Sequence, residues 1–204
     1  MNRLSKIFLG LLLCCTVLVS CGDWELRRQM KSFMAQVITL PSELQEIKCG
    51  SISPVTITMS NSTMVFFYGN DECSSCAIDH LKDDLLGFVD IEQSGKCKVV
   101  VLFSPSEDDL MDVQEKIRGL EFHFPIYVDF YGDFYRLNKD FPSDRRFHSF
   151  LLGNDAHPVF VGNPLHGKKL YKVFEKVLKN KQNINVYNTS VKIYRTKKLN
   201  NGSR

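Results

Sequence analysis

The chain of 204 residues has no internal repeat, no low-complexity tract and no apolar run after the first 20 residues that could span a membrane. These absences exclude a repeat architecture and a chain that crosses a membrane several times. Hydrophobic residues make up 44% of the chain and charged residues 24%, which is the balance of a globular protein rather than of a disordered one. The length is suited to one domain with appendages.

The first 20 residues predict an export signal. Arg3 and Lys6 precede an apolar stretch over residues 7–19 that is too short for a stable membrane-spanning helix. The stretch ends in "LVSC", which resembles the lipobox of bacterial lipoproteins and implies a signal peptide over 1–20 and a lipid on Cys21. We therefore expect a lipid-anchored protein of the cell envelope, facing the periplasm or the outer surface. A plain secretory signal or an uncleaved anchor is the alternative.

Charge is distributed unevenly along the chain. Residues 165–204 contain 11 Lys and Arg against the single acid Glu175, whereas residues 7–164 contain 13 basic and 22 acidic residues. The basic tail over 181–204 could contact anionic headgroups, or the acidic body of its own domain, or simply be solvated. Solvation or self-contact is favoured, and export argues against nucleic acid as a partner.

Periodicity predicts an α/β domain over residues 49–180, preceded over 21–48 by an amphipathic helix (24–38) and a linker. Strands that alternate with helices and end in two closing strands indicate an α/β sheet that is covered on both faces. Strands are predicted over 54–59, 63–69, 97–104, 124–129, 147–152 and 158–162, and helices over 73–89, 106–119, 133–139 and 168–179.

The segment "GNDECSSCAIDHL" contains Cys73 and Cys76, with two serines between them. A strand precedes the segment and a helix begins near Cys73, so Cys73 would lie where unpaired backbone amides and the helix dipole stabilise a thiolate. The thiolate is the nucleophile in disulfide exchange. Cys76 would lie one turn further along the helix, placed to attack a mixed disulfide that Cys73 forms.

The order of strand, Cys-x-x-Cys and helix, followed by "CKVVVLFS", "FPIYVD" and "FHSFLL", resembles the thioredoxin superfamily over residues 50–180. It is most similar to the membrane-anchored thioredoxin-like lipoproteins of bacteria. The resemblance implies a thioredoxin-like fold, a central mixed sheet with helices on both faces. It also implies a redox disulfide in which Cys73 is the exposed nucleophile and Cys76 the resolving cysteine. The expected activity is thiol–disulfide exchange with protein thiols or disulfides, without a cofactor.

Three positions depart from that family's pattern. Carboxylates at residues 71–72 replace the usual aromatic residue before the first cysteine and should make Cys73 less acidic. Phe66 or Phe67 stands where the family has a buried acid, and neither can take a proton. Phe147 stands where a cis-proline normally opens the strand, so a trans bond is expected. Phe147 and His148 would then face the two cysteines across the partner-binding groove.

Other functions of the cysteine pair can be weighed from the sequence. Haem attachment requires a histidine directly after the second cysteine, and Ala77 excludes it. His80, four residues after Cys76, could complete a copper site of the kind that thioredoxin-like copper chaperones use. The remaining alternative is a redox-inactive domain that serves as a binding module of the envelope.

Cys49 and Cys97 are the other two cysteines of the mature chain apart from Cys21. They could form a structural disulfide, or each could be a buried free thiol. Together with Cys73 and Cys76 they could nominally supply the four ligands of a zinc site, but they lack the close spacing of a ligand pair, and an oxidising compartment favours disulfides.

Overall fold

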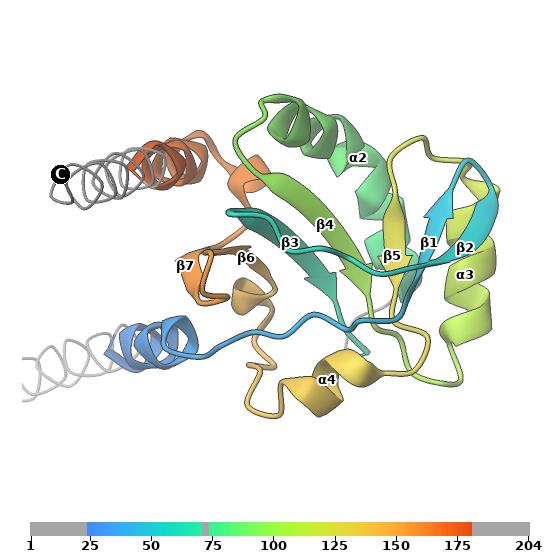
Figure 1. Ribbon diagram of the computed structural model, residues 1–204, viewed down its shortest axis with the longest axis horizontal. Helices are drawn as coiled ribbons and strands as arrows, with labels where there is room; N and C mark the ends of the chain where they lie inside the picture. The colour runs from blue at the N-terminus through green and yellow to red at the C-terminus, as the bar shows by residue number, and fades with distance from the viewer. Residues whose placement is uncertain (1–23, 71–73, 181–204) are drawn as a thin grey trace, which may run out of the picture.

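A computed structural model describes residues 24–70 and 74–180 of the chain, which form one sheet with helices on both sides (Figure 1). The predicted signal peptide, Cys21, Asp71, Glu72, Cys73 and the basic tail lie outside the described residues. The sheet has seven strands in the order β2-β1-β5-β4-β3-β6-β7. The strands are β1 (Leu44–Lys48), β2 (Ser51–Val55), β3 (Thr63–Tyr68), β4 (Lys98–Phe103), β5 (Ile126–Val128), β6 (Ser149–Leu152) and β7 (Pro158–Val161).

The strand directions confirm the predicted fold. β3, β4 and β5 are parallel neighbours, and α2 (Ser74–Gln93) connects β3 to β4 as a crossover helix. On the other side of β3, β6 runs antiparallel and is followed by the antiparallel β7. A strand, a helix and a parallel strand, closed later by an antiparallel pair beside the first strand, make the fold thioredoxin-like.

Two hydrophobic cores lie on the two faces of the sheet, because successive side chains of a strand point to opposite faces. Met64 and Phe66 of β3 face one core, and Val65 and Phe67 face the other. The first core packs against α2, α3 (Leu110–Gly119) and the helical residues 168–180. The second packs against α4 (Asp133–Leu137) and the helical residues 24–34. Figure 1 shows α2 and α4 on opposite sides of the sheet.

The second core is built mainly from phenylalanine rings. Phe33, from the helical residues 24–34, is fully buried and contacts three of them edge-to-face, with centroid distances of 5.5–5.6 Å to Phe141, Phe147 and Phe150. Such pairs contribute about 0.5–1.5 kcal/mol beyond the burial of their area. The predicted amphipathic helix is therefore present and packs on the core at Phe33, although it ends at residue 34 rather than 38.

The start of the domain differs from the prediction. The sheet begins at Leu44 rather than after residue 49, because β1 pairs with both β2 and β5. Of the strand predicted over 54–59, only Pro54 and Val55 belong to β2. The hairpin escaped prediction because β2 is an edge strand with almost entirely exposed residues, so it has no apolar alternation. Residues 21–48 are thus not merely a helix and a linker.

Two helix starts can be compared with the sequence. α3 begins at Leu110, four residues after the predicted start of this helix at residue 106, since residues 107–109 form a turn. The Ser106 hydroxyl donates to the Asp109 carboxylate at 2.7 Å and accepts the Asp109 backbone N–H at 3.3 Å. α2 begins at Ser74, within a residue of the predicted start. Within residues 24–70 and 74–180, no helix is both long enough and apolar enough to cross a membrane.

Candidate functional site

Cys76 lies in the first turn of α2, just beyond the carboxyl end of β3, and its side chain is exposed. The first turn of a helix has backbone N–H groups without helical partners, and the dipole there is positive. A sulfur at this position therefore lies in a field that favours a thiolate. Cys73, predicted to be the attacking sulfur, lies outside the described residues.

A cavity of about 590 Å³ opens beside Cys76. Four segments that are distant in sequence line it: the end of β3, the first half of α2, the turn before β6 and the segment after β7. The lining residues are Phe67, Tyr68, Cys76, Ala77, His80, Asp84, Arg145, Arg146, His148, Ser149, Gly162, Asn163, His166 and Leu170.

His148 fixes the wall of the cavity that faces α2. It directly precedes β6, and its carbonyl accepts the N–H of Phe67 at 2.8 Å, which extends the β3–β6 pairing by one residue. Its ring is buried, donates from Nε2 to the carbonyl of Pro142 at 3.1 Å, and stacks on Phe141 with centroids 5.4 Å apart. The structure thus brings His148 and Cys76, both predicted site residues, to one cavity.

The prediction for Phe147 is wrong. Its ring is fully buried in the second core, against Phe33, and it does not line the cavity. The physical reason is a 3-10 turn, η1 (Arg145–Phe147), which places β6 two residues later than the apolar pattern suggests and turns Phe147 to the face opposite α2. No cis peptide bond occurs within the described ranges, as expected at this position.

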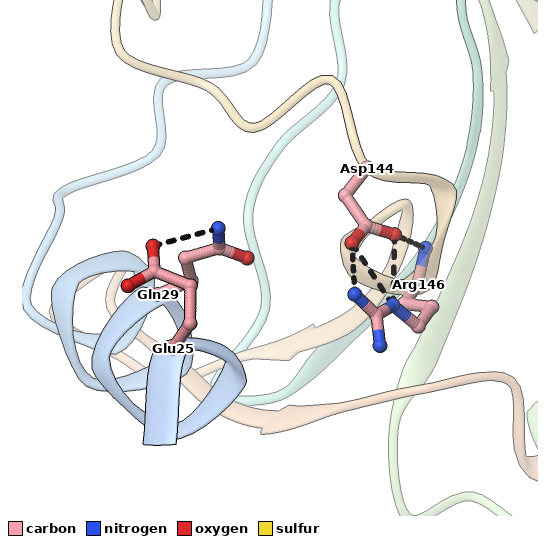
Figure 2. A network of polar contacts seen from close by, with 4 residues as sticks. All are labelled: Glu25, Gln29, Asp144 and Arg146. Atoms are coloured by element: carbon pink, nitrogen blue, oxygen red, sulfur yellow. Dashed lines mark hydrogen bonds and ion pairs between the residues drawn. The ribbon is translucent and has the colours of Figure 1, made fainter. Parts of the chain in front are cut away.

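The turn η1 is held by a carboxylate. Asp144 accepts the backbone N–H of Arg146 at 3.0 Å and two bonds from its guanidinium Nε at 2.9 and 3.0 Å. Figure 2 shows the two side chains facing each other, while Glu25 and Gln29 on the neighbouring helix bond to one another. Hydrogen bonds from the Arg146 side chain lower the pKa of Asp144 from its ordinary value. The carboxylate therefore stays charged and keeps the turn beside the cavity in place.

The carboxylate that lines the cavity comes from α2, and not from β3, where the thioredoxin resemblance would place a buried acid. Phe66 is buried under α2 and its ring lies 4.5 Å from that of Phe88, so an apolar surface occupies the place of the family's acid. Asp84, two turns after Cys76 on α2, lines the cavity instead, with its Oδ2 3.4 Å from Nε2 of His166. Asp84 and His166 were missed because they are 82 residues apart and neither has motif spacing.

Cys49 and Cys97 are free thiols, so the structural disulfide suggested from sequence is not present. Cys97 precedes β4 and is buried in the first core, whereas Cys49 is exposed in the turn between β1 and β2. Burial, followed by the negative charge of Glu92, raises the pKa of Cys97 to about 12. Neither sulfur lines the cavity with Cys76.

The copper and zinc sites considered from the sequence can be compared with the positions of these side chains. Within residues 24–70 and 74–180, no three His, Cys, Asp or Glu side chains are grouped so that they could hold a metal ion. His80, suggested as a copper ligand, is exposed on α2 and lines the cavity.

Several solved structures are similar to this chain. An uncharacterised thioredoxin-like protein from Porphyromonas gingivalis is 13% identical, with 69% of this chain and 90% of that one covered and a TM-score of 0.41. AhpC from Enterococcus faecalis is 15% identical, with coverages of 74% and 93% and a TM-score of 0.44. StoA from Bacillus subtilis is 19% identical, with coverages of 60% and 89% and a TM-score of 0.40.

No family model matches the chain, and no curated protein matches it significantly. The three structures named above are at most 19% identical to it and have TM-scores below 0.5, so they carry no conclusion about this chain. The thioredoxin-like fold rests on the strand order and the crossover helix described above. The resemblance that the sequence predicts is thus confirmed for the fold.

Proposed function

We propose that this protein is a thiol–disulfide oxidoreductase of the cell envelope that acts on protein thiols or disulfides through Cys73 and Cys76. The observation that carries the proposal is the place of Cys76, in the first turn of α2 at the mouth of a cavity of about 590 Å³. Two residues separate Cys73 from Cys76 in the sequence, and the chemistry needs no cofactor.

The reaction follows from that order. The Cys73 thiolate attacks one sulfur of a partner disulfide, and the other partner sulfur leaves as a thiol. Cys76 then attacks Cys73 in the mixed disulfide, which releases the second partner thiol and leaves a Cys73–Cys76 disulfide. Two electrons pass from the cysteine pair to the partner, and the reverse sequence oxidises a partner dithiol.

The cavity wall supports a protein as the partner. His148 and Ser149 line the cavity at the start of β6, and Ala77 and Leu170 add apolar surface. An extended segment on either side of a partner cysteine could lie along such a wall. The absence of an acid at Phe66 and Phe67 leaves the resolving sulfur without a carboxylate base on β3.

Reduction of insulin by dithiothreitol tests the activity. The wild-type protein should accelerate the appearance of turbidity, and the double variant Cys73→Ser, Cys76→Ser should not, because the electron-carrying pair is gone. The reduction potential of the pair then gives the direction. A value near that of cytoplasmic thioredoxin indicates a reductant, and one tens of millivolts higher indicates an oxidant or isomerase. Equal rates for the two proteins would favour a binding module.

A lipid on Cys21 is the anchor in this proposal, supported by the sequence "LVSC". Cys21→Ser should move the protein from the membrane pellet to the soluble fraction after fractionation in a high-salt wash. One acyl chain of myristoyl length binds only marginally, so several chains are expected on the wild type. Cys49→Ser serves as the matched control and should stay in the pellet. A Cys21→Ser protein that still sediments with membranes would contradict the lipobox.

A further inference from the structure

A second thiol lies at the end of the sheet opposite the cavity. Cys49 and Gly50 form the two-residue turn between β1 and β2, and the Cys49 sulfur lies 3.2 Å from Nδ1 of His123. His123 belongs to the loop before β5, at the amino end of the parallel strands, whereas Cys76 follows the carboxyl end of β3. Both side chains of the pair are exposed.

The backbone holds this pair together. Cys49 donates its N–H to the carbonyl of Phe122, the residue before His123, at 2.7 Å. The turn itself requires left-handed backbone at both positions, with φ of 49° at Cys49 and 71° at Gly50. Asn or Asp at the first position would adopt that conformation with less strain than cysteine. The turn alone therefore gives no reason for a cysteine beside an imidazole.

An imidazole within hydrogen-bond distance can take the proton of a thiol as the sulfur attacks, which is the arrangement of a cysteine activated by an adjacent base. We propose that Cys49 and His123 form a second thiol-reactive site, which takes one half of a low-molecular-weight disulfide by exchange, independently of Cys73 and Cys76. The exposed turn gives such a molecule direct access to the sulfur.

The step balances with the small disulfide as the oxidant. The Cys49 S–H proton passes to Nδ1 of His123, and the thiolate attacks one sulfur of R–S–S–R. The new Cys49–S–S–R bond forms as the old S–S bond breaks, and the leaving thiolate takes the proton from His123. Cys49–SH and R–S–S–R give Cys49–S–S–R and R–SH, and excess thiol reverses the reaction.

The charged residues near Cys49 determine which variant can serve as a control for a substitution of His123. Lys48 precedes Cys49, and Glu121 reaches the turn from the α3–β5 loop, where its Cγ would be 3.6 Å from a Cβ built on Gly50. The carbonyl of Arg118 lies near the same point. Lys48→Gln removes a nearby positive charge and leaves the imidazole in place, so it separates a general charge effect from proton transfer to His123.

The experiment incubates the full-length protein with 2-hydroxyethyl disulfide, which carries no charge, and follows the peptide that contains Cys49 by mass spectrometry. Cys49 should gain the hydroxyethylthiol group, and His123→Gln should slow this about tenfold at pH 6.5, a modest general-base effect. Lys48→Gln should change the rate by no more than about twofold, since exposed charges are screened by salt. Cys97 should stay unmodified in every variant, and its modification would reveal unfolding.

Two further measurements test the role of His123 and the independence of the two thiol sites. The rate for His123→Gln should fall more steeply below pH 7 than that of the wild type, which a purely structural role of His123 would not cause. Cys49→Ser should reduce insulin as the wild type does, because the two thiol sites are at opposite ends of the sheet. An unchanged Cys49 rate in a folded His123→Gln variant, or a Cys49–Cys49 dimer of the chain as the main product, would overturn the proposal.

Discussion

Cys76→Ser should accumulate mixed disulfides with envelope proteins, visible as bands of high mass on a non-reducing gel after acid quenching. The variant keeps Cys73, which forms the mixed disulfide, and lacks the thiol that resolves it. An intramolecular thiol acts at an effective concentration far above that of any external thiol, so the lifetime of the mixed disulfide should lengthen at least about a hundredfold. A reducing gel of the same sample should lose the bands.

Cys73→Ser is the matched variant and should trap few partners. The proposed roles give Cys73 the attack on the partner disulfide and Cys76 the resolution, so without Cys73 no attacking thiol remains at the redox pair. Cys49→Ser should leave the pattern of bands unchanged in a Cys76→Ser background. If Cys73→Ser traps as much as Cys76→Ser, the roles of the two cysteines are reversed; if neither traps, the redox function is wrong.

Phe33→Ala should lower the free energy of unfolding by about 3–5 kcal/mol, the usual cost of removing a buried phenylalanine ring. The ring is fully buried and contacts Phe141, Phe147 and Phe150, so its loss leaves a cavity between the helical residues 24–34 and the sheet. Urea unfolding followed by tryptophan fluorescence and circular dichroism would measure the change.

Met34→Ala is the control for that experiment. Met34 is the next residue on the same helix but is 38% exposed, so its truncation should cost less than about 1 kcal/mol. Similar values for the two variants would mean that the helix does not pack on the sheet in solution. A loss limited to Phe33→Ala would establish that the domain begins before residue 44.

The central strands were predictable because burial on both faces leaves a continuous apolar run. β3 and β4 have it, and their bounds differ from the predicted strands by a residue or so at either end. β2 has no such run, since its residues face solvent, and no apolar pattern indicates its pairing with β1. The glycine at position 50 is a turn signal that could have indicated the hairpin, because both residues of this turn have positive φ and glycine adopts that conformation readily.

The candidate site was predictable only where a motif marks it. Cys76 and His148 are found in the cavity as the thioredoxin resemblance implies, but Phe147 is rotated to the other face by one 3-10 turn. A hydrophobic pattern cannot distinguish the first residue of a strand from the last of a turn. The contact between Cys49 and His123 joins residues 74 apart in the chain, which no local pattern encodes.

With the lipid proposed on Cys21, the docking of Phe33 would also limit how far the domain moves from a membrane. Because the helical residues 24–34 belong to the folded body, only residues 22 and 23 would separate them from a lipid on Cys21. Even a fully extended chain spans about 3.5 Å per residue, so this tether would reach on the order of 10 Å. Such a domain could not sample the depth of the envelope freely, and its partners would have to come to the membrane surface.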